Sequence, residues 1–259
     1  MHVTQLSLTH FRSYENIELT FQPGVNTFIG NNGCGKTNIV EALIYLGFLS
    51  SHRVSTNAPL IHKDRDQAII RTEITSDDRS LAVDLEINAS KANRARINQN
   101  PTKSQREILG ALQIIYFTPE DLDLVRGEPT ERRDFMDKLL ITRAPRLAGV
   151  ISDYDRVLRQ RNTLLKTRAP ENALLPWTEQ LITLGAELTA ERIKLVAKLN
   201  PFLTQNYANL NEVKTASIAY KSTTDEVAHE TNKTNTYKLF SSVAFAVMAY
   251  VAASKWLKF

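Results

Sequence analysis

Apolar and polar residues alternate along much of the first 117 residues of this 259-residue chain. An alternation of period two is typical of strands that bury one face, and turn-forming residues separate the runs. From this alternation and from short apolar runs, strands are predicted over residues 3–8, 17–21, 25–29, 68–74, 81–87, 94–97 and 114–117. One helix is predicted among them, because residues 38–49 carry apolar side chains at helical spacing. The first part of the chain is therefore predicted to be rich in β-structure.

From residue 130 onward the apolar residues recur with the period of a helix. Thr130 is expected to cap the first of these helices, and Pro145 separates it from a second. A third helix is predicted over residues 177–199, where Pro201 is expected to stop it. We therefore predict an α/β fold of three parts. These are a β-rich lobe over residues 1–117, a helical lobe over residues 118–225 and a tail of different character over residues 226–259.

One segment carries recognisable chemistry, because residues 30–37 satisfy the pattern GxxxxGK[ST] between a predicted strand and a predicted helix. Its candidate nucleotide-binding residues are Gly30, Asn31, Asn32, Gly33, Cys34, Gly35, Lys36 and Thr37. Glycines let the backbone turn its N–H groups around a β-phosphate, at the positive end of the helix. Lys36 would reach the β and γ oxygens, and the hydroxyl of Thr37 would hold Mg²⁺. The alternative is a flexible connection with an incidental lysine.

The net charge of +4 favours a polyanionic partner only weakly, so the distribution of the charge matters more. A first cluster, free of acids between residues 88 and 106, consists of Lys91, Arg94, Arg96, Lys103 and Arg106. A second, helical cluster consists of Arg143, Arg146, Arg156, Arg159, Arg161, Lys166 and Arg168. Of these we single out Arg94, Arg96, Lys103, Arg106, Arg156, Arg159 and Arg161 as candidates for contacting DNA phosphates. The alternative for each cluster is a solvated hairpin or helix face.

The single cysteine, Cys34, excludes a disulfide framework and any cysteine-based metal site. A chain without disulfides suits a reducing compartment, and no signal peptide opens it, so a cytoplasmic location is predicted. Cys34 lies in the phosphate loop, where it is either a packing residue or a redox-sensitive thiol.

Several further segments match one protein family along about the first 220 residues. Residues 8–14 read LTHFRSY, residues 30–42 read GNNGCGKTNIVEA and residues 51–53 read SHR. Residues 117–125 read FTPEDLDLV, residues 131–135 read ERRDF and residues 159–166 read RQRNTLLK. In these segments the chain resembles the RecF family of bacterial recombination and repair ATPases, which is related to the ABC-type heads of SMC proteins. The resemblance implies a P-loop NTPase fold of the ABC/SMC head type.

The resemblance also implies roles for residues outside the phosphate loop. Arg12 and Ser13 would lie beside the nucleotide, although Arg12 would otherwise form a surface salt bridge. His52 and Arg53 would line the same cleft or a DNA-facing side. Residues 117–125 would report the γ-phosphate to the helical lobe, unless the acids at 120 and 121 simply cap a helix.

At the level of the whole family, the resemblance implies an ATP- and Mg²⁺-dependent homodimer that closes over DNA. Such a clamp would act at single-stranded or gapped DNA with RecO and RecR, in recombinational repair, replication and the SOS response. Its DNA affinity would be independent of sequence and would fall steeply with salt.

The chain departs from the family pattern after the helical lobe. Neither a Ser-Gln-Gly signature nor a Leu-Asp-Asp Walker B motif occurs in it, so weak nucleotide binding without hydrolysis is expected. An exposed sheet edge is expected as well, because the absent part would add strands. The tail suggests a frameshift or premature stop, a membrane anchor over residues 239–257, or a buried terminal helix. An anchor would make the chain a membrane-tethered, non-hydrolysing nucleotide-binding module. A kinase, which would share the phosphate loop, is disfavoured because no lid or acceptor pattern follows.

Overall fold

The computed structural model of the chain describes residues 1–76, 79–118, 121, 124, 128–209 and 216–220. Within this part the chain forms two compact units, and each is described by itself. The first comprises Met1–Ile114 with Ile141–Pro145, and the second comprises Ile115–Leu140 with the described residues from Arg146 onward.

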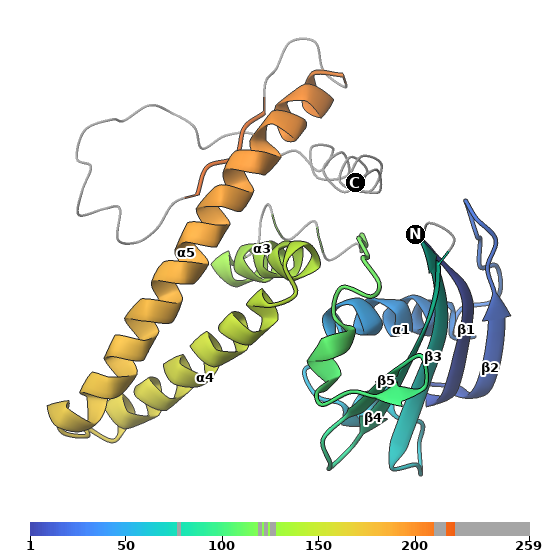
Figure 1. Cartoon of the computed structure of the whole chain (residues 1–259), viewed down its shortest axis with the longest axis horizontal. Coiled ribbons are helices and arrows are strands. Elements are labelled where there is room, and N and C mark those ends of the chain that lie inside the picture. Colours follow the sequence, from blue (N-terminus) through green and yellow to red (C-terminus); the bar gives the residue numbers. More distant parts are fainter. Residues whose placement is uncertain (77–78, 119–120, 122–123, 125–127, 210–215, 221–259) are drawn as a thin grey trace. The chain divides into compact units, whose positions relative to one another are not determined.

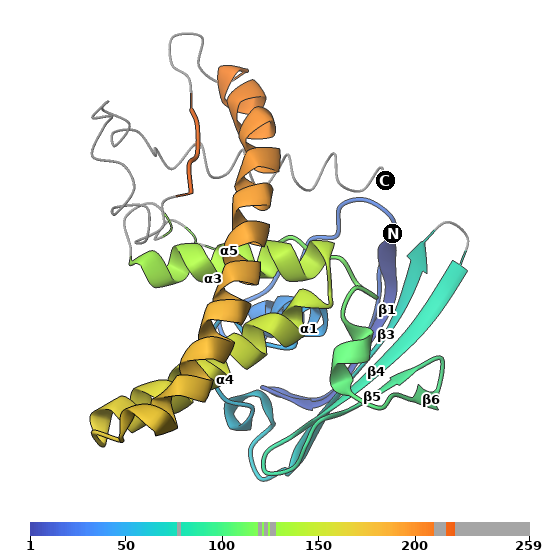
Figure 2. The ribbon, with the colours of Figure 1, turned by 60° about the vertical axis from the view of Figure 1, so that its left-hand side comes forward.

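The first unit is built on an antiparallel sheet of six strands in the order β2-β1-β3-β4-β5-β6 (Figure 1, Figure 2). The strands are β1 His2–Phe11, β2 Tyr14–Thr20, β3 Gln67–Ser76, β4 Arg79–Asn88, β5 Arg94–Ile97 and β6 Asn100–Pro101. The ladders place Leu8 of β1 opposite both Ile17 and Ile70. Ile70 in turn lies opposite Leu85, so apolar side chains of neighbouring strands share one face. Five of the seven predicted strands are confirmed.

One helix, α1 (Lys36–Phe48), packs against this apolar face and closes the core of the first unit. Its buried side chains, including Ile39, Ala42, Tyr45 and Leu46, join the inward-facing residues of β1, β3 and β4 in a single cluster. Two 3₁₀ turns, Ala58–Leu60 and Gln105–Ile108, border the cluster. The helix predicted over residues 38–49 is confirmed, and its first residues form the end of the GxxxxGK[ST] segment.

Two of the predicted strands are wrong. Residues 25–29 form no strand, and Val25 and Ile29 are 93% and 91% exposed. Residues 114–117 also form no strand, and Ile114 packs instead on the buried Gly47 of α1. A short apolar run makes a strand only where a neighbouring strand completes its hydrogen bonds. Within the described residues no strand pairs with either segment.

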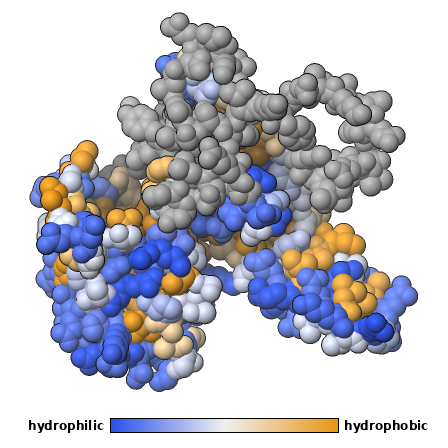
Figure 3. Space-filling view, turned by 180° about the vertical axis from the view of Figure 1, so that it is seen from behind, coloured by the Kyte–Doolittle hydropathy of each residue, from blue (hydrophilic) through white to orange (hydrophobic). Residues whose placement is uncertain are grey.

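The second unit is helical, and its two longest helices pack along each other (Figure 1). The helices are α3 Pro129–Arg143, α4 Leu147–Lys166 and α5 Glu171–Ala208. Pro145 separates α3 from α4 as predicted. In the space-filling view the surface of α4 and α5 shows apolar patches between charged residues (Figure 3). Their exposed apolar side chains include Leu165, Leu175, Ile182 and Ile193.

Two predicted helix boundaries are wrong. Thr130 lies inside α3, because Pro129 occupies the first helical position, where its missing N–H group needs no partner. Pro201 does not stop the third helix, which runs from Glu171 to Ala208. Beyond the proline, Leu203 and Tyr207 are buried against Ala216, and this packing offsets the lost hydrogen bond.

Candidate nucleotide site

The turn that leads into α1 has the backbone conformation that its glycines allow. Gly33 and Gly35 have φ angles of 82° and 96°, and Gly35 is the N-cap of α1. A Cβ atom on Gly35 would lie 2.6 Å from the hydroxyl oxygen of Tyr14 and 3.0 Å from Oγ of Ser13. Gly35 is therefore required both for its φ angle and for the close approach of the β1–β2 turn.

The N-terminus of α1 carries an unneutralised positive end. Its N-cap has no side chain, and its first turn contains no acidic residue. The Nζ atom of Lys36 donates to the carbonyl oxygens of Gly30 and Asn31 at 2.7 Å each and lies 3.6 Å from Sγ of Cys34. Thr37 is exposed in the first turn, so solvent reaches its side chain. Backbone amides, an ammonium group and a hydroxyl thus gather at one turn, and this set suits a phosphate with a bound Mg²⁺.

The β1–β2 turn lies against this loop and the first turn of α1 through Ser13 and Tyr14. Ser13 accepts a hydrogen bond from Nδ2 of Asn38 at 3.0 Å, and the hydroxyl of Tyr14 donates to the carbonyl of Cys34 at 3.3 Å. Burial and the nearby Cys34 raise the pKa of Tyr14, which keeps its phenol a hydrogen-bond donor at neutral pH. Arg12 adopts the left-handed region with a φ of 55°, a strained conformation for a residue other than glycine.

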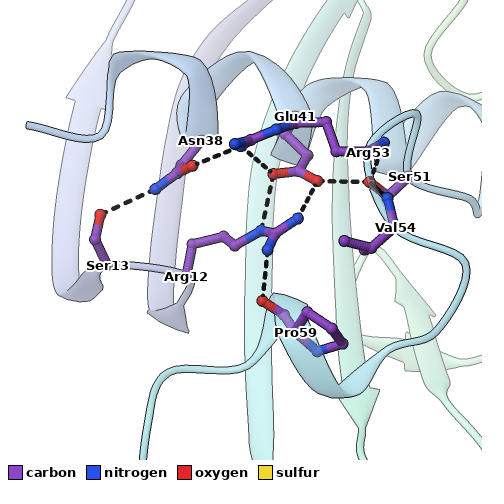
Figure 4. A network of polar contacts seen from close by, with 8 residues as sticks. All are labelled: Arg12, Ser13, Asn38, Glu41, Ser51, Arg53, Val54 and Pro59. Carbon is purple, nitrogen blue, oxygen red and sulfur yellow. Dashed lines mark hydrogen bonds and ion pairs between the residues drawn. The ribbon is translucent and has the colours of Figure 1, made fainter. Parts of the chain in front are cut away.

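A buried carboxylate, Glu41 of α1, organises the charged groups beside the loop (Figure 4). Arg12 donates to both of its oxygens, at 2.9 Å from Nε and 2.6 Å from Nη2. The Ser51 hydroxyl donates to it at 2.5 Å and Nη1 of Arg53 at 3.2 Å. Burial alone would raise the pKa of Glu41, but these hydrogen bonds and the two positive charges outweigh burial and lower the pKa.

The residues predicted to lie beside the nucleotide differ in how far hydrogen bonds within the protein occupy them and in how exposed they are. Arg12 is held by Glu41 and by the carbonyl of Pro59, to which Nη1 donates at 2.8 Å. Its side chain is 15% exposed, against 43% for Arg53. His52 lies partly buried next to Arg53. Of the two arginines, Arg53 is therefore the more accessible to a ligand.

Sequence reasoning missed Glu41 and Asn38 as parts of this site. A signal for Glu41 was present, because it lies three, four and seven residues before buried apolar residues of the same helix. A carboxylate on the apolar face of a helix needs partners within the fold. Asn38, in contrast, gives no such signal, since its two contacts are made by residues distant in the sequence.

The predicted DNA-binding residues of the first unit lie in mixed surroundings. Arg94 and Arg96 lie on the outer face of β5, because the buried Ala95 between them faces the core. The register sets Arg94 opposite Glu86 and Arg96 opposite Asp84. Residues 88–106 contain no acidic residue, but in the folded sheet two of their arginines lie opposite acidic residues of β4. Lys103 and Arg106 are also exposed.

The candidates on α4 do not form one group. Arg156 pairs with Asp153 at 3.2 Å and is exposed, as is Arg159. Arg161 is half-buried, and its Nε donates to the Thr178 hydroxyl of α5 at 2.9 Å. Arg161 therefore contributes to the contact between the two helices, whereas Arg156 and Arg159 face solvent.

Three other predictions concern residues that lie partly or wholly outside the described part of the chain. Asp121 accepts hydrogen bonds from the N–H and hydroxyl groups of Thr118, which is the geometry of a helix cap, whereas residue 120 lies outside the described residues. The tail at 226–259 lies outside them as well. In the part of the chain that the structure describes, no helix combines the length and apolar character needed to cross a membrane.

Comparisons with known proteins agree on one family. The family model of the RecF/RecN/SMC N-terminal domain matches residues 2–169. The DNA replication and repair protein RecF of Streptomyces avermitilis is 49% identical over 220 residues, covering 81% of this chain and 59% of that protein. The protein of the same name from Kineococcus radiotolerans is 50% identical over 207 residues, covering 77% and 53%. The chain thus spans between 53% and 59% of the length of these relatives.

Solved structures show the same similarity. The recombination mediator protein RecF-ATPrS in the RecFOR pathway superimposes with a TM-score of 0.76 at 25% identity, over 82% of this chain and 58% of that one. RecF-ATP of the same pathway superimposes with a TM-score of 0.76 at 22% identity. The fold is therefore that of a RecF-type ATPase head.

Proposed function

The chain belongs to the family of RecF, RecN and SMC N-terminal domains, and on this premise we propose that it is the ATP-binding part of a DNA replication and repair protein. The observation that carries the proposal is the uncapped N-terminus of α1, with Lys36 folded over the loop before it. A phosphate at this position would receive N–H groups of the loop and of the first helical turn. ATP and Mg²⁺ are the ligands that fit this donor set best.

Each residue of the site has a distinct task in this proposal. Lys36 would exchange the carbonyl oxygens of Gly30 and Asn31 for the β and γ oxygens of ATP, since a charge-assisted bond to phosphate is the stronger one. Thr37 would hold Mg²⁺ through its hydroxyl. Gly35 keeps the loop free of a side chain where Tyr14 and Ser13 approach. Bound ATP would supply the charge that draws these groups together.

DNA is the proposed macromolecular ligand, in single-stranded or gapped form. The relatives reported above are named for DNA replication and repair, and the solved structures for recombination in the RecFOR pathway. We accordingly propose RecO and RecR as partners, an ATP-dependent homodimer as the active form, a role in the SOS response and a cytoplasmic location.

Equilibrium binding of MgATP to the full chain tests the proposal. Lys36→Ala removes the ammonium group and is expected to abolish measurable binding. Lys91→Ala, which removes another exposed lysine of the same unit, is the matched control and is expected to bind as the wild type does. A folded wild-type protein that retains no MgATP, or a Lys36→Ala variant that binds unchanged, would contradict the proposal.

A further inference from the structure

Glu41 is buried in α1, and four donor atoms converge on it from the β1–β2 turn and from the segment after α1. We propose that Glu41 is a positioning residue of the nucleotide site, which holds the β1–β2 turn against the phosphate loop through Arg12. The inference rests on the proposed function, because it concerns the geometry of that same site. It assigns Arg12 to holding the turn, in place of a contact with the nucleotide.

The first support is the way in which Arg12 is committed. Its Nε, Nη1 and Nη2 atoms all donate to acceptors within the first unit, two of them on Glu41 and one on Pro59. A paired, fork-shaped contact of this kind fixes both the position and the orientation of a guanidinium group. The strained backbone of Arg12, with its φ of 55°, persists only where the surroundings hold it. Glu41 holds the guanidinium group of Arg12, and the carbonyl oxygens of Pro59 and Leu60 accept the remaining hydrogen bonds of Arg12.

The second support is the reach of the turn that Arg12 anchors. The next two residues, Ser13 and Tyr14, both contact the loop or the first turn of α1. Their oxygens lie 3.0 Å and 2.6 Å from the place that a Cβ of Gly35 would occupy. A small shift of the turn would therefore change the space beside Gly35 and the hydrogen bond to the carbonyl of Cys34.

The third support is a second connection that closes a ring of contacts (Figure 4). Arg53 donates to Glu41 and also to Oδ1 of Asn38, both at 3.2 Å. Asn38 in turn donates to Ser13. The ring therefore runs from Glu41 through Arg53 and Asn38 to the turn, and returns through Arg12. With both ends of the turn connected to Glu41, one side chain sets its position relative to the loop.

The test replaces Glu41 by glutamine in the full chain, a change that keeps the shape of the side chain and removes its charge. Tyr45→Phe is the matched control, because Tyr45 is buried on the same helix and its hydroxyl also takes part in hydrogen bonds, at 2.9 Å to Asn57 and 3.3 Å from Asn93. Glu41→Gln is expected to weaken MgATP binding roughly tenfold, the size typical when a side chain that supports a binding site from outside its direct contacts is changed. Tyr45→Phe is expected to leave the affinity unchanged when compared at equal folded fraction.

A second measurement does not depend on nucleotide. Cys34 is the single cysteine and is exposed, so the rate at which a disulfide reagent labels it reports on the loop alone. Glu41→Gln is expected to raise this rate several-fold in the absence of ATP, and Tyr45→Phe is expected to leave it unchanged.

The outcomes separate this inference from the proposed function. If wild-type protein binds MgATP and Glu41→Gln matches it in affinity or in labelling rate, the inference is overturned. It is overturned equally if Tyr45→Phe produces the same changes, since general destabilisation would then explain them. If wild-type protein does not bind MgATP, the proposed function fails, and the labelling rates alone decide whether Glu41 positions the turn.

Discussion

Each unit contains a carboxylate that two nitrogens of one arginine hold, yet the two carboxylates differ in the direction of their pKa shifts. Arg12 donates to Glu41 at 2.9 Å and 2.6 Å, and Arg192 of α5 donates to Asp137 of α3 at 2.9 Å and 2.8 Å. The Glu41 side chain has no exposed surface, whereas that of Asp137 is 16% exposed. The deeper carboxylate has the lowered pKa, and the shallower one has the raised pKa.

The difference arises from the neighbours of each pair. Burial raises the pKa of both carboxyl groups. At Glu41 a second arginine and the Ser51 hydroxyl join Arg12, and together they outweigh burial. At Asp137 Arg192 acts alone, and the charges of Asp134 and Asp155 oppose it. The number of donors around a carboxylate, more than its depth, decides whether its charged form is favoured.

Removal of each arginine gives the largest expected contrast. Arg12→Ala leaves a carboxylate without solvent contact and is expected to lower the free energy of unfolding by about 3 kcal/mol, as for other broken buried pairs. Arg192→Ala leaves a carboxylate whose side chain keeps some contact with water, so a smaller loss of about 1–2 kcal/mol is expected. Urea unfolding at pH 7, followed by circular dichroism, measures both values. Equal losses in the two variants would contradict the view that Glu41 depends more strongly on its charge.

The pH dependence of stability is expected to differ in sign between the two pairs. The pKa of Glu41 is lowered in the folded protein, so its stabilisation is complete above the ordinary value of 4.5 and disappears as the pH falls through the folded pKa. The pKa of Asp137 is raised above 3.8, so the folded state takes up a proton first as the pH falls. In the window between 3.8 and its folded pKa, Asp137 therefore favours folding more at lower pH.

Neutral variants isolate these two contributions. Unfolding free energies of the wild type, Glu41→Gln and Asp137→Asn are compared between pH 7 and pH 3. Glu41→Gln is expected to lose less stability than the wild type as the pH falls below 4.5, because the group that must be protonated is gone. Asp137→Asn is expected to lose more, because it lacks the proton uptake that favours folding. Shifts of the same sign in both variants would refute the assignment.

The same contrast shows what the sequence could predict of the fold. The antiparallel strands were predicted because alternation on a sheet with one buried face is a local pattern. Residues 25–29 are a short run rich in apolar residues and form no strand, since a strand also needs a neighbour. The continuation of α5 past Pro201 depends on packing against Ala216, which lies outside the helix itself. The predicted RecF and SMC type of ATPase head is confirmed.

The site was predictable where its residues are consecutive. Residues 30–37 lie together because they form one turn before one helix, and the pattern GxxxxGK[ST] describes that turn. The partners of Glu41 come from the β1–β2 turn and from the segment after α1, so only the folded chain brings them together. In the same way, the acids opposite Arg94 and Arg96 became visible only from the strand register. Contacts between segments that are distant in the sequence could not be predicted from the order of residues along the chain.

The smallest effect is expected for an exposed pair, which completes the series from buried to solvated. Arg156 and Asp153 lie at 3.2 Å on α4, with side chains 57% and 50% exposed. Water screens such a pair, so Arg156→Ala is expected to change the free energy of unfolding by less than about 0.5 kcal/mol. Urea unfolding of Arg156→Ala and of Arg12→Ala measures how much more stability is lost when a buried pair is broken than when an exposed one is.

Arg156→Ala also separates stability from the proposed contact with DNA. If Arg156 contacts a phosphate, the variant is expected to bind single-stranded DNA more weakly at every sequence, with a salt dependence shallower by about one counterion. Lys194→Ala, which breaks the exposed pair with Glu191 on α5, serves as the control and is expected to leave both stability and DNA affinity unchanged. Because Arg156 contributes almost nothing to folding, a loss of affinity in this variant would come from the contact itself, and an unchanged salt dependence would remove Arg156 from the DNA-binding residues.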